Sequence, residues 1–185
     1  MKRQLIFCIA LVALMTSCVK EPSILRRLNA EDAAAIPYQI RQKLNFMDEN
    51  GDTLTFTVNY DETTPFSENS WDYPDDSKMS IFRQPWCYAR TVQLRCKSDT
   101  VIQKMMFTVV PEKYMYFRWN NDMELPRIDL KGDTETIEVN GVTYENVHVN
   151  QYYDAHGELY HQWYYSEEVG LIYVKDKDHS LTLIP

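Results

Sequence analysis

The sequence is poor in glycine, in basic residues and in long apolar runs, and each shortage excludes a class of function. Its five glycines stand far apart among 185 residues. They form neither a glycine-rich phosphate loop nor the Gly-x-Ser-x-Gly turn of many hydrolases. Lysine and arginine number 19 against 27 acidic residues, a net charge of −8, which argues against nucleic acid as a partner. No apolar run reaches the ~18 residues that a transmembrane helix needs.

The start of the chain has the three-part layout of a bacterial export signal. Lys2 and Arg3 precede an apolar run over residues 5–15, and small and polar residues then lead to Cys18. The run is too short to cross a bilayer, and its end resembles the lipobox, in which the cysteine is acylated. We therefore expect a signal peptide over 1–17 and a palmitate-bearing lipid anchor at Cys18. The alternative is an ordinary signal peptide followed by an incidental cysteine.

Removal of residues 1–17 leaves 168 residues with 17 basic and 27 acidic side chains, a net charge of −10. An acidic body is not attracted to an anionic membrane surface, so the acyl chains must supply the attachment. We expect residues 18–35 to form the anchor and its tether, with a short helix capped by Asn29 and stopped by Pro37. Residues 36–185 then form one antiparallel β domain, since this length suits a single core.

The use of cysteine agrees with export but predicts no cross-link. Cys8 leaves with the signal and Cys18 carries lipid, so Cys87 and Cys96 remain. These two lie nine residues apart in a segment that is predicted as one strand, which separates them by about 30 Å. A disulfide needs Cα atoms within ~7 Å, and the odd spacing places the side chains on opposite faces. A bridge would require a bend or bulge between Cys87 and Cys96, and we do not expect one.

Alternation of apolar and polar residues predicts β-strands from residue 38 onwards. The first strand places Tyr38 and Ile40 on its buried face, and its hairpin turns at residues 48–52. A later hairpin turns at Asn140-Gly141, a pair suited to a type I′ turn. Roughly nine strands are expected, without the intervening helices of a parallel sheet. The predicted fold class is mainly β, an antiparallel meander that forms a sandwich, half-barrel or barrel.

Two features of composition point beyond the fold. Residues 61–85 lack alternation and contain three prolines, so a long loop is expected there, which is uncommon without a role. The chain also has 13 tyrosines and 4 tryptophans, and adjacent rings on a strand must point to opposite faces. Some rings are therefore expected at the surface, where they suit contact with protein, peptide or glycan; the alternative is that tyrosine simply favours strands. The candidate contact aromatics are Trp71, Trp119, Tyr153, Trp163 and Tyr165.

No motif marks catalysis or metal binding. The turn at 48–52 holds three carboxylates, but its glycine comes fourth rather than sixth, which favours a hairpin over a calcium loop. The four histidines match no zinc spacing, and neither Cys87 nor Cys96 has a marked histidine partner. A pair of carboxylates among 27 carries little weight. We expect no catalytic residue, no metal and no cofactor.

Two stretches carry a family resemblance. One runs from Pro37-Tyr38 through Gly51-Asp52 into a Phe-Thr-Val strand, and the other is the closing pattern over residues 137–147 and 164–172. Together they cover about half of the mature chain, and they resemble small envelope lipoproteins that are abundant in Bacteroidetes. The resemblance implies an envelope lipoprotein with an antiparallel β body, and it carries over no catalytic residue.

The leading hypothesis is a lipid-anchored, non-enzymatic binding or accessory module of the bacterial cell envelope. Its lipid would hold it in the outer membrane, and its partner would be a protein, peptide or glycan. One alternative is a carrier of an apolar ligand in a barrel or half-barrel cavity, which requires unfilled inward positions. Another is a glycan hydrolase, which requires a cleft with paired carboxylates of displaced pKa.

Overall fold

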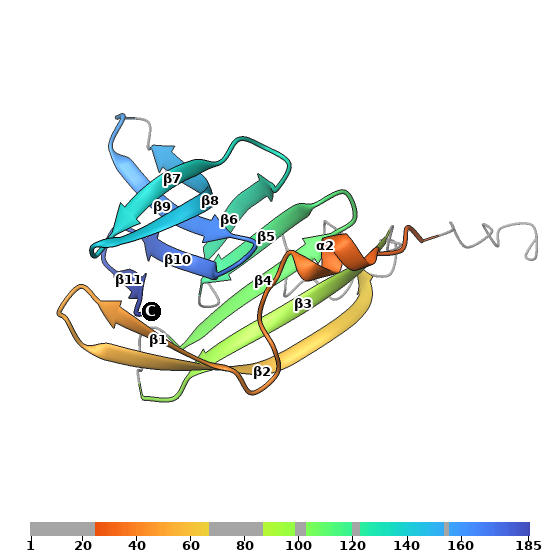
Figure 1. The fold of residues 1–185 in the computed structure, drawn as a ribbon, viewed down its shortest axis with the longest axis horizontal. Helices are drawn as coiled ribbons and strands as arrows, with labels where there is room; N and C mark the ends of the chain where they lie inside the picture. The colour runs from red at the N-terminus through yellow and green to blue at the C-terminus, as the bar shows by residue number, and fades with distance from the viewer. Residues whose placement is uncertain (1–24, 67–86, 99–102, 120–122, 154–155) are drawn as a thin grey trace, which may run out of the picture.

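The computed structural model describes residues 25–66, 87–98, 103–119, 123–153 and 156–185. Trp71 and most of the expected loop over 61–85 lie outside these ranges. The described residues form eleven strands and one short helix (Figure 1). The elements are α2 (Ala30–Ala34), β1 (Lys43–Asp48), β2 (Thr53–Phe66), β3 (Cys87–Cys96), β4 (Lys104–Val110), β5 (Tyr114–Trp119), β6 (Met123–Asp129), β7 (Glu135–Val139), β8 (Val142–Tyr153), β9 (Leu159–Ser166), β10 (Gly170–Lys175) and β11 (Ser180–Leu183).

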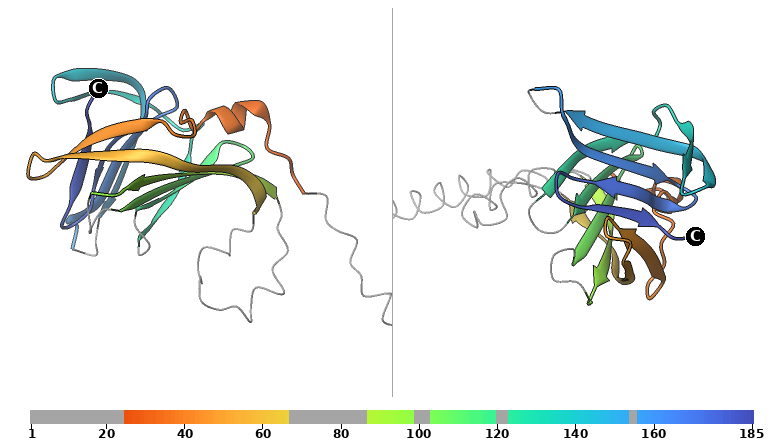
Figure 2. Two further views of the ribbon diagram at one scale, coloured as in Figure 1. Left: turned by 90° about the horizontal axis from the view of Figure 1, so that it is seen from below. Right: turned by 90° about the vertical axis from the view of Figure 1, so that its left-hand side faces the viewer.

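The strands form one antiparallel meander that bends round on itself. Their order across the sheet is β6-β5-β4-β3-β2-β1-β11-β10-β9-β8-β7, so the first strand pairs with the last. Phe46 of β1 lies opposite Leu183 of β11. β6 and β7 follow each other in the chain but stand at the two ends of the order, which leaves the curled sheet open between them (Figures 1 and 2). The predicted antiparallel meander is therefore confirmed, and it is a half-barrel.

The concave face of the half-barrel holds the main core. Because side chains alternate along a strand, every second residue points inward, and Phe107, Phe117 and Trp163 are fully buried there. The ring centroids of Phe107 and Phe117 lie 4.7 Å apart, and those of Phe117 and Trp163 lie 5.1 Å apart. Rings from β4, β5 and β9 thus meet inside the curl of the sheet and pack against one another.

The arm at residues 25–38 belongs to the folded body, so the expected tether is wrong from residue 25 onwards; residues 18–24 lie outside the described ranges. The start of the arm pairs with the beginning of β3, where the carbonyl of Arg26 accepts the N–H of Tyr88 at 2.9 Å. Asn29 caps α2 as predicted, and its Oδ1 accepts the N–H of Asp32 at 2.7 Å. The core then takes up the next side chains of the arm, Ala35, Ile36 and Tyr38. The arm shows no alternation of apolar and polar residues, so the sequence did not predict that it packs into the core.

Two buried tyrosine hydroxyls tie the arm to the opposite wall of the half-barrel. The hydroxyl of Tyr38 accepts the N–H of Leu171 on β10 at 2.6 Å, and the hydroxyl of Tyr165 donates to the carbonyl of Ala35 at 2.7 Å. Burial raises the pKa of both tyrosines well above the usual value, so both phenols stay neutral. Gly170 precedes Leu171 with a φ of +91° and lies directly against the Tyr38 ring.

The guanidinium of Arg90 on β3 makes the third tie. Its Nε and Nη2 each donate to the carboxylate of Asp61 at 2.8 Å. Its Nη1 donates to the carbonyls of Ala33 at 2.6 Å and Ile36 at 2.8 Å, and its Nη2 also donates to the carbonyl of Tyr38 at 2.9 Å. One side chain thus donates to three carbonyls of the arm, including one in α2, where the last carbonyls of the helix have few other donors.

The prediction for Ile40 is wrong. The chain turns between the arm and β1, where the N–H of Gln42 bonds the carbonyl of Gln39 at 2.9 Å and Arg41 has a φ of 70°. This turn interrupts the strand that was expected to carry both Tyr38 and Ile40. Tyr38 is buried, whereas Ile40 is 54% exposed.

The later hairpin and the cysteines agree with prediction. Asn140 and Gly141 have φ values of 51° and 77°, the positive pair that a type I′ turn requires. Cys87 and Cys96 form no disulfide with each other, and both are buried, at the two ends of β3. They belong to separate clusters on opposite faces of the sheet, as their odd spacing predicts.

Candidate functional site

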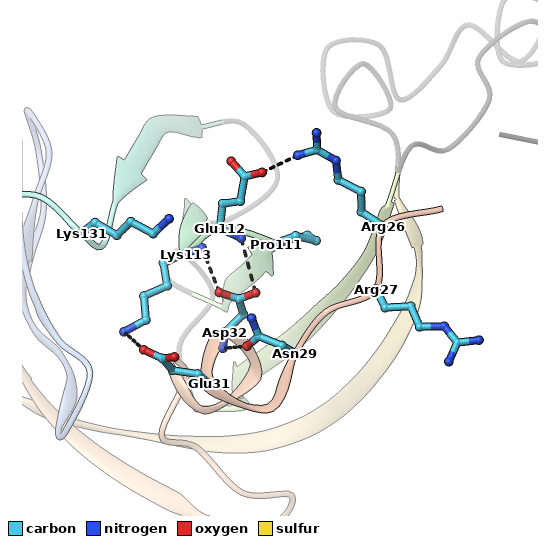
Figure 3. Close-up of a pocket in the computed structure, with 9 residues that line it drawn as sticks. All are labelled: Arg26, Arg27, Asn29, Glu31, Asp32, Pro111, Glu112, Lys113 and Lys131. Atoms are coloured by element: carbon cyan, nitrogen blue, oxygen red, sulfur yellow. Dashed lines mark hydrogen bonds and ion pairs between the residues drawn. The ribbon is translucent and has the colours of Figure 1, made fainter. Parts of the chain in front are cut away.

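A polar pocket of ≈ 520 Å³ lies where the arm meets the turn between β4 and β5 (Figure 3). Three segments distant in sequence build it: the arm with α2, the β4–β5 turn, and the loop between β6 and β7. Its lining residues are Arg26, Arg27, Asn29, Glu31, Asp32, Pro111, Glu112, Lys113 and Lys131. A volume of this size falls within the range of small-molecule sites, which is about 300–1,000 Å³.

Asp32 forms the floor of the pocket and fixes its shape. Its side chain is 3% exposed, and its two carboxylate oxygens accept the N–H groups of Glu112 at 3.3 Å and Lys113 at 3.1 Å. These two turn residues have φ values of 72° and 58°, a left-handed conformation that is unfavourable for side chains of this kind. The buried carboxylate therefore holds the turn in a conformation that it would not readily keep alone.

Asp32→Asn is expected to lower the free energy of unfolding by about 1–3 kcal/mol, because the amide has one acceptor oxygen and leaves one turn N–H unpaired. Chemical denaturation measures the change. Glu31→Gln, at the neighbouring exposed position on α2, is the control and should stay within about 0.5 kcal/mol of the wild type. Equal losses for the two variants would contradict the role assigned to Asp32.

Four cations surround the pocket, and two of them are held in ion pairs. Arg26 pairs with Glu112, and Lys113 lies 3.1 Å from Glu31 and 3.4 Å from Glu167. The hydrogen bond to Glu31 is the main cause that raises the pKa of Lys113, so this amine is protonated at neutral pH. It is a fixed positive charge rather than a nucleophile.

The other two cations, Arg27 and Lys131, have no acidic partner within the part of the chain that the structure describes. The backbone places Lys131 beside the turn, because the N–H of Leu130 bonds the carbonyl of Lys113 at 2.8 Å. In Figure 3 the Lys131 side chain extends towards Glu112, whereas Arg27 points outward from the rim. Arg27 also lines a second depression of ≈ 330 Å³ with Leu28, Thr63 and Tyr88.

The sequence did not predict this site. Its residues come from positions 26–32, 111–113 and 131, and none of these segments has a motif. The adjacent pair Arg26-Arg27 in an acidic chain was the one local signal, but the pair was assigned to a tether. The pocket suits a polar anion, because its carboxylates are already engaged in ion pairs or in backbone hydrogen bonds.

Three candidate contact aromatics are buried, so the prediction of a surface role for them is wrong. Trp119 is 3% exposed, and Trp163 and Tyr165 are fully buried. On β9, Trp163 and Tyr165 are two residues apart and both point inward, and Tyr164 between them takes the outer face. Among the candidates in the described ranges, Tyr153 alone is exposed, at 58%.

Two other exposed side chains lie next to Tyr153 on the β8–β9 hairpin. It lies opposite Leu159 where β8 pairs with β9, and Tyr160 follows. All three are exposed large apolar side chains, and they form the aromatic edge of the β8–β9 hairpin. In Figures 1 and 2 this hairpin lies at the opposite side of the body from the arm and α2.

The acidic turn at 48–52 is a hairpin, as predicted. Asp48 Oδ1 accepts the N–H groups of Asn50 at 2.9 Å and Asp52 at 2.8 Å, which is the bonding of an Asx turn. Glu49 instead reaches the neighbouring turn, where it accepts the N–H of Ser180 at 2.9 Å and lies 3.1 Å from the ring of His179. Within the described ranges, no three metal-ligating side chains come together.

The Glu49–His179 pair makes stability depend on pH. The pair raises the pKa of His179 above 6.5, and the Ser180 N–H is the main cause that lowers the pKa of Glu49 below 4.5. The histidine contribution is complete below 6.5 and is lost as pH rises through its raised pKa. The glutamate contribution is complete above 4.5 and is lost as pH falls through its lowered pKa. The pair therefore stabilises the fold most between these two values.

Glu49→Gln is expected to destabilise the protein most near pH 5–6 and less on either side. Both side chains are about a third exposed, so solvent screening keeps the effect below about 1 kcal/mol. Denaturation of both proteins across this range gives the difference curve. A difference that does not change with pH would contradict the assignment.

No helix within the described ranges combines the length and apolar character needed to cross a membrane. Comparison of the chain with protein-family models, with curated proteins and with solved structures found no match.

Proposed function

We propose that this chain is a non-enzymatic binding module of the bacterial cell envelope, held at the outer membrane by lipid on Cys18. The observation that carries the proposal is the export signal ending at Cys18, followed closely by the folded body. Leu25, where the described chain begins, comes seven positions after Cys18. At ~3.6 Å per residue, the lipid can stand at most about 25 Å from the body.

This arrangement gives the two sides of the body different roles. The arm and the polar pocket lie at the side where the described chain begins, and the aromatic edge of Tyr153, Leu159 and Tyr160 lies at the opposite side (Figure 1). Exposed tyrosines suit a protein, peptide or glycan partner. An anchor near Leu25 would leave that edge free to meet such a partner.

The two alternatives have less support. A carrier of an apolar ligand needs open space on the concave face, where Phe107, Phe117 and Trp163 pack against one another. A glycan hydrolase needs an acid and a base on either side of a cleft. In the polar pocket, Glu31 and Glu112 are paired with cations and Asp32 is bonded to backbone.

Cys18→Ala is expected to abolish incorporation of labelled palmitate and to remove the protein from the carbonate-resistant membrane fraction. The reason is that acyl chains supply the attachment, at roughly 0.8 kcal/mol per buried methylene. Fractionation and labelling in an acylating bacterial host measure the effect. Cys8→Ala, in the signal itself, is the matched control and should label like the wild type. A Cys18→Ala protein that still resists carbonate extraction would show that the anchor lies elsewhere.

A further inference from the structure

We propose that the polar pocket beside the arm binds a phosphate group of a small polar ligand or of a lipid headgroup. This goes beyond membrane anchoring through Cys18. The pocket gathers four cations and three carboxylates in a chain whose net charge is −8. Glu167 also pairs with Lys113 from outside the lining, so four cations balance four carboxylates here, whereas the chain as a whole is acidic.

The free donors in the pocket suit a doubly charged group. The carboxylate of Asp32 is engaged with two backbone N–H groups, and Glu31 and Glu112 are engaged with Lys113 and Arg26. Lys131 has no acidic partner in the described ranges and extends into the pocket (Figure 3). Its ammonium has three N–H donors, and a phosphate has the acceptor oxygens and charge to use them.

Two further arginines can complete the site. The guanidinium of Arg26 bonds Glu112 through one nitrogen, Nη1, and a guanidinium has five N–H donors. Arg27 follows it on the rim, where its side chain points outward and would have to change rotamer to reach a ligand; it has no acidic partner within the described ranges. Arginine side chains bind phosphate in a bidentate manner. The rim thus offers more donors than its own carboxylates accept.

The backbone that carries the pocket is held in place by hydrogen bonds within the fold. The arm is fixed by Arg90 and by Tyr165, the turn is held by Asp32, and the loop carrying Lys131 is bonded to the turn through Leu130. Ordering of these segments is complete before the ligand arrives, so its binding does not have to supply that order.

The source of the phosphate is a lipid headgroup or a soluble phosphorylated molecule. The membrane source depends on the proposed anchor at Cys18, which would keep the pocket close to headgroups. The soluble source does not depend on it. Both would meet the same cations, so one set of variants tests both.

The test is isothermal titration calorimetry on the full chain with Cys18→Ala in a neutral maltoside detergent. One arm uses glycerol 3-phosphate, and the other uses short-chain dihexanoylphosphatidylglycerol as a soluble lipid. We expect saturable binding in at least one arm that weakens about tenfold in Arg27→Gln/Lys131→Gln. The matched control is Lys43→Gln/Lys177→Gln, which removes the same charge from exposed positions outside the pocket and should bind like the parent.

A third variant separates binding from folding. Glu112→Gln removes a competing acid and releases Arg26, while the backbone N–H that bonds Asp32 is kept. It is expected to bind phosphate several times more tightly, a gain that a merely structural role would not give. Binding of glycerol 3-phosphate assigns a soluble ligand, and binding of the lipid alone assigns a headgroup. Absence of binding in both arms, or equal weakening by pocket and control variants, would overturn the proposal. All variants in this test carry Cys18→Ala, so a negative result would not bear on the proposed lipid anchor.

Discussion

Gly170→Ala is expected to lower the free energy of unfolding by about 3–5 kcal/mol, through backbone strain and steric overlap together. Gly170 has a φ of +91°, and a Cβ added there would lie 2.5 Å from Cε1 of Tyr38 and closer still to Cζ and the hydroxyl oxygen. The tyrosine has little room to move away. Its hydroxyl is bonded to Leu171, its carbonyl to Arg90, and its ring lies 5.4 Å from that of Phe107.

The matched control for Gly170→Ala is Gly141→Ala. Gly141 has a φ of +77°, but a Cβ there has no neighbour within 4 Å. It should cost only the strain of the left-handed conformation, about 1–2 kcal/mol. Chemical denaturation of both variants therefore isolates the Tyr38 overlap as the difference between them. Losses of equal size would mean that the Tyr38 ring yields without cost and that the arm is loosely held.

These two glycines also illustrate what the sequence could predict. Asn140-Gly141 lies between two alternating runs, and the reason for its glycine is contained in the turn itself. No local sequence pattern explains Gly170, because its neighbour Tyr38 is 132 positions away in the chain. Local periodicity predicted most of the strands and the antiparallel fold. It carries no information on contacts between residues far apart in the chain, such as that of the Tyr38 ring with the backbone of Gly170.

Two strands run through a proline. β2 continues to Phe66 through Pro65, where a loop was expected, and β6 includes Pro126, where no strand was expected. Both positions have a free strand edge. β1 pairs with β2 only as far as Thr57, and β6 is an end strand of the sheet. A residue without an N–H is tolerated at such an edge, and the sequence does not reveal which strands are edges.

The candidate site failed to appear in the sequence for a related reason. The pocket exists because a buried carboxylate, Asp32, accepts two N–H groups some 80 residues further along. From the sequence alone, Asp32 is indistinguishable from an ordinary exposed aspartate in a short helix. Only the docked arm turns Arg26 and Arg27 from tether residues into the rim of a site.

Arg90→Met is expected to lower the free energy of unfolding by about 2–4 kcal/mol. It leaves the Asp61 carboxylate and three arm carbonyls without their donor, and a lone buried charge is costly. The side chains of Arg90 and Asp61 are 16% and 25% exposed, so water offsets part of the loss. Asp61→Asn, the control, keeps the guanidinium on the three carbonyls and should cost about 1 kcal/mol.

Arg90→Met also tests whether the Arg90 side chain is the main contact that holds the arm, and with it the pocket, in place. If it is, hydrogen exchange of the Leu171 N–H, which bonds Tyr38, should speed up in Arg90→Met beyond the change expected from global stability. Arg90→Lys should restore little, because one ammonium cannot reach the carboxylate and three carbonyls together. Unchanged exchange at Leu171 would show that the hydroxyls of Tyr38 and Tyr165 are enough to hold the arm.

Loss of arm docking should also remove phosphate binding, since Arg26, Arg27 and Asp32 are all carried to the pocket by the arm.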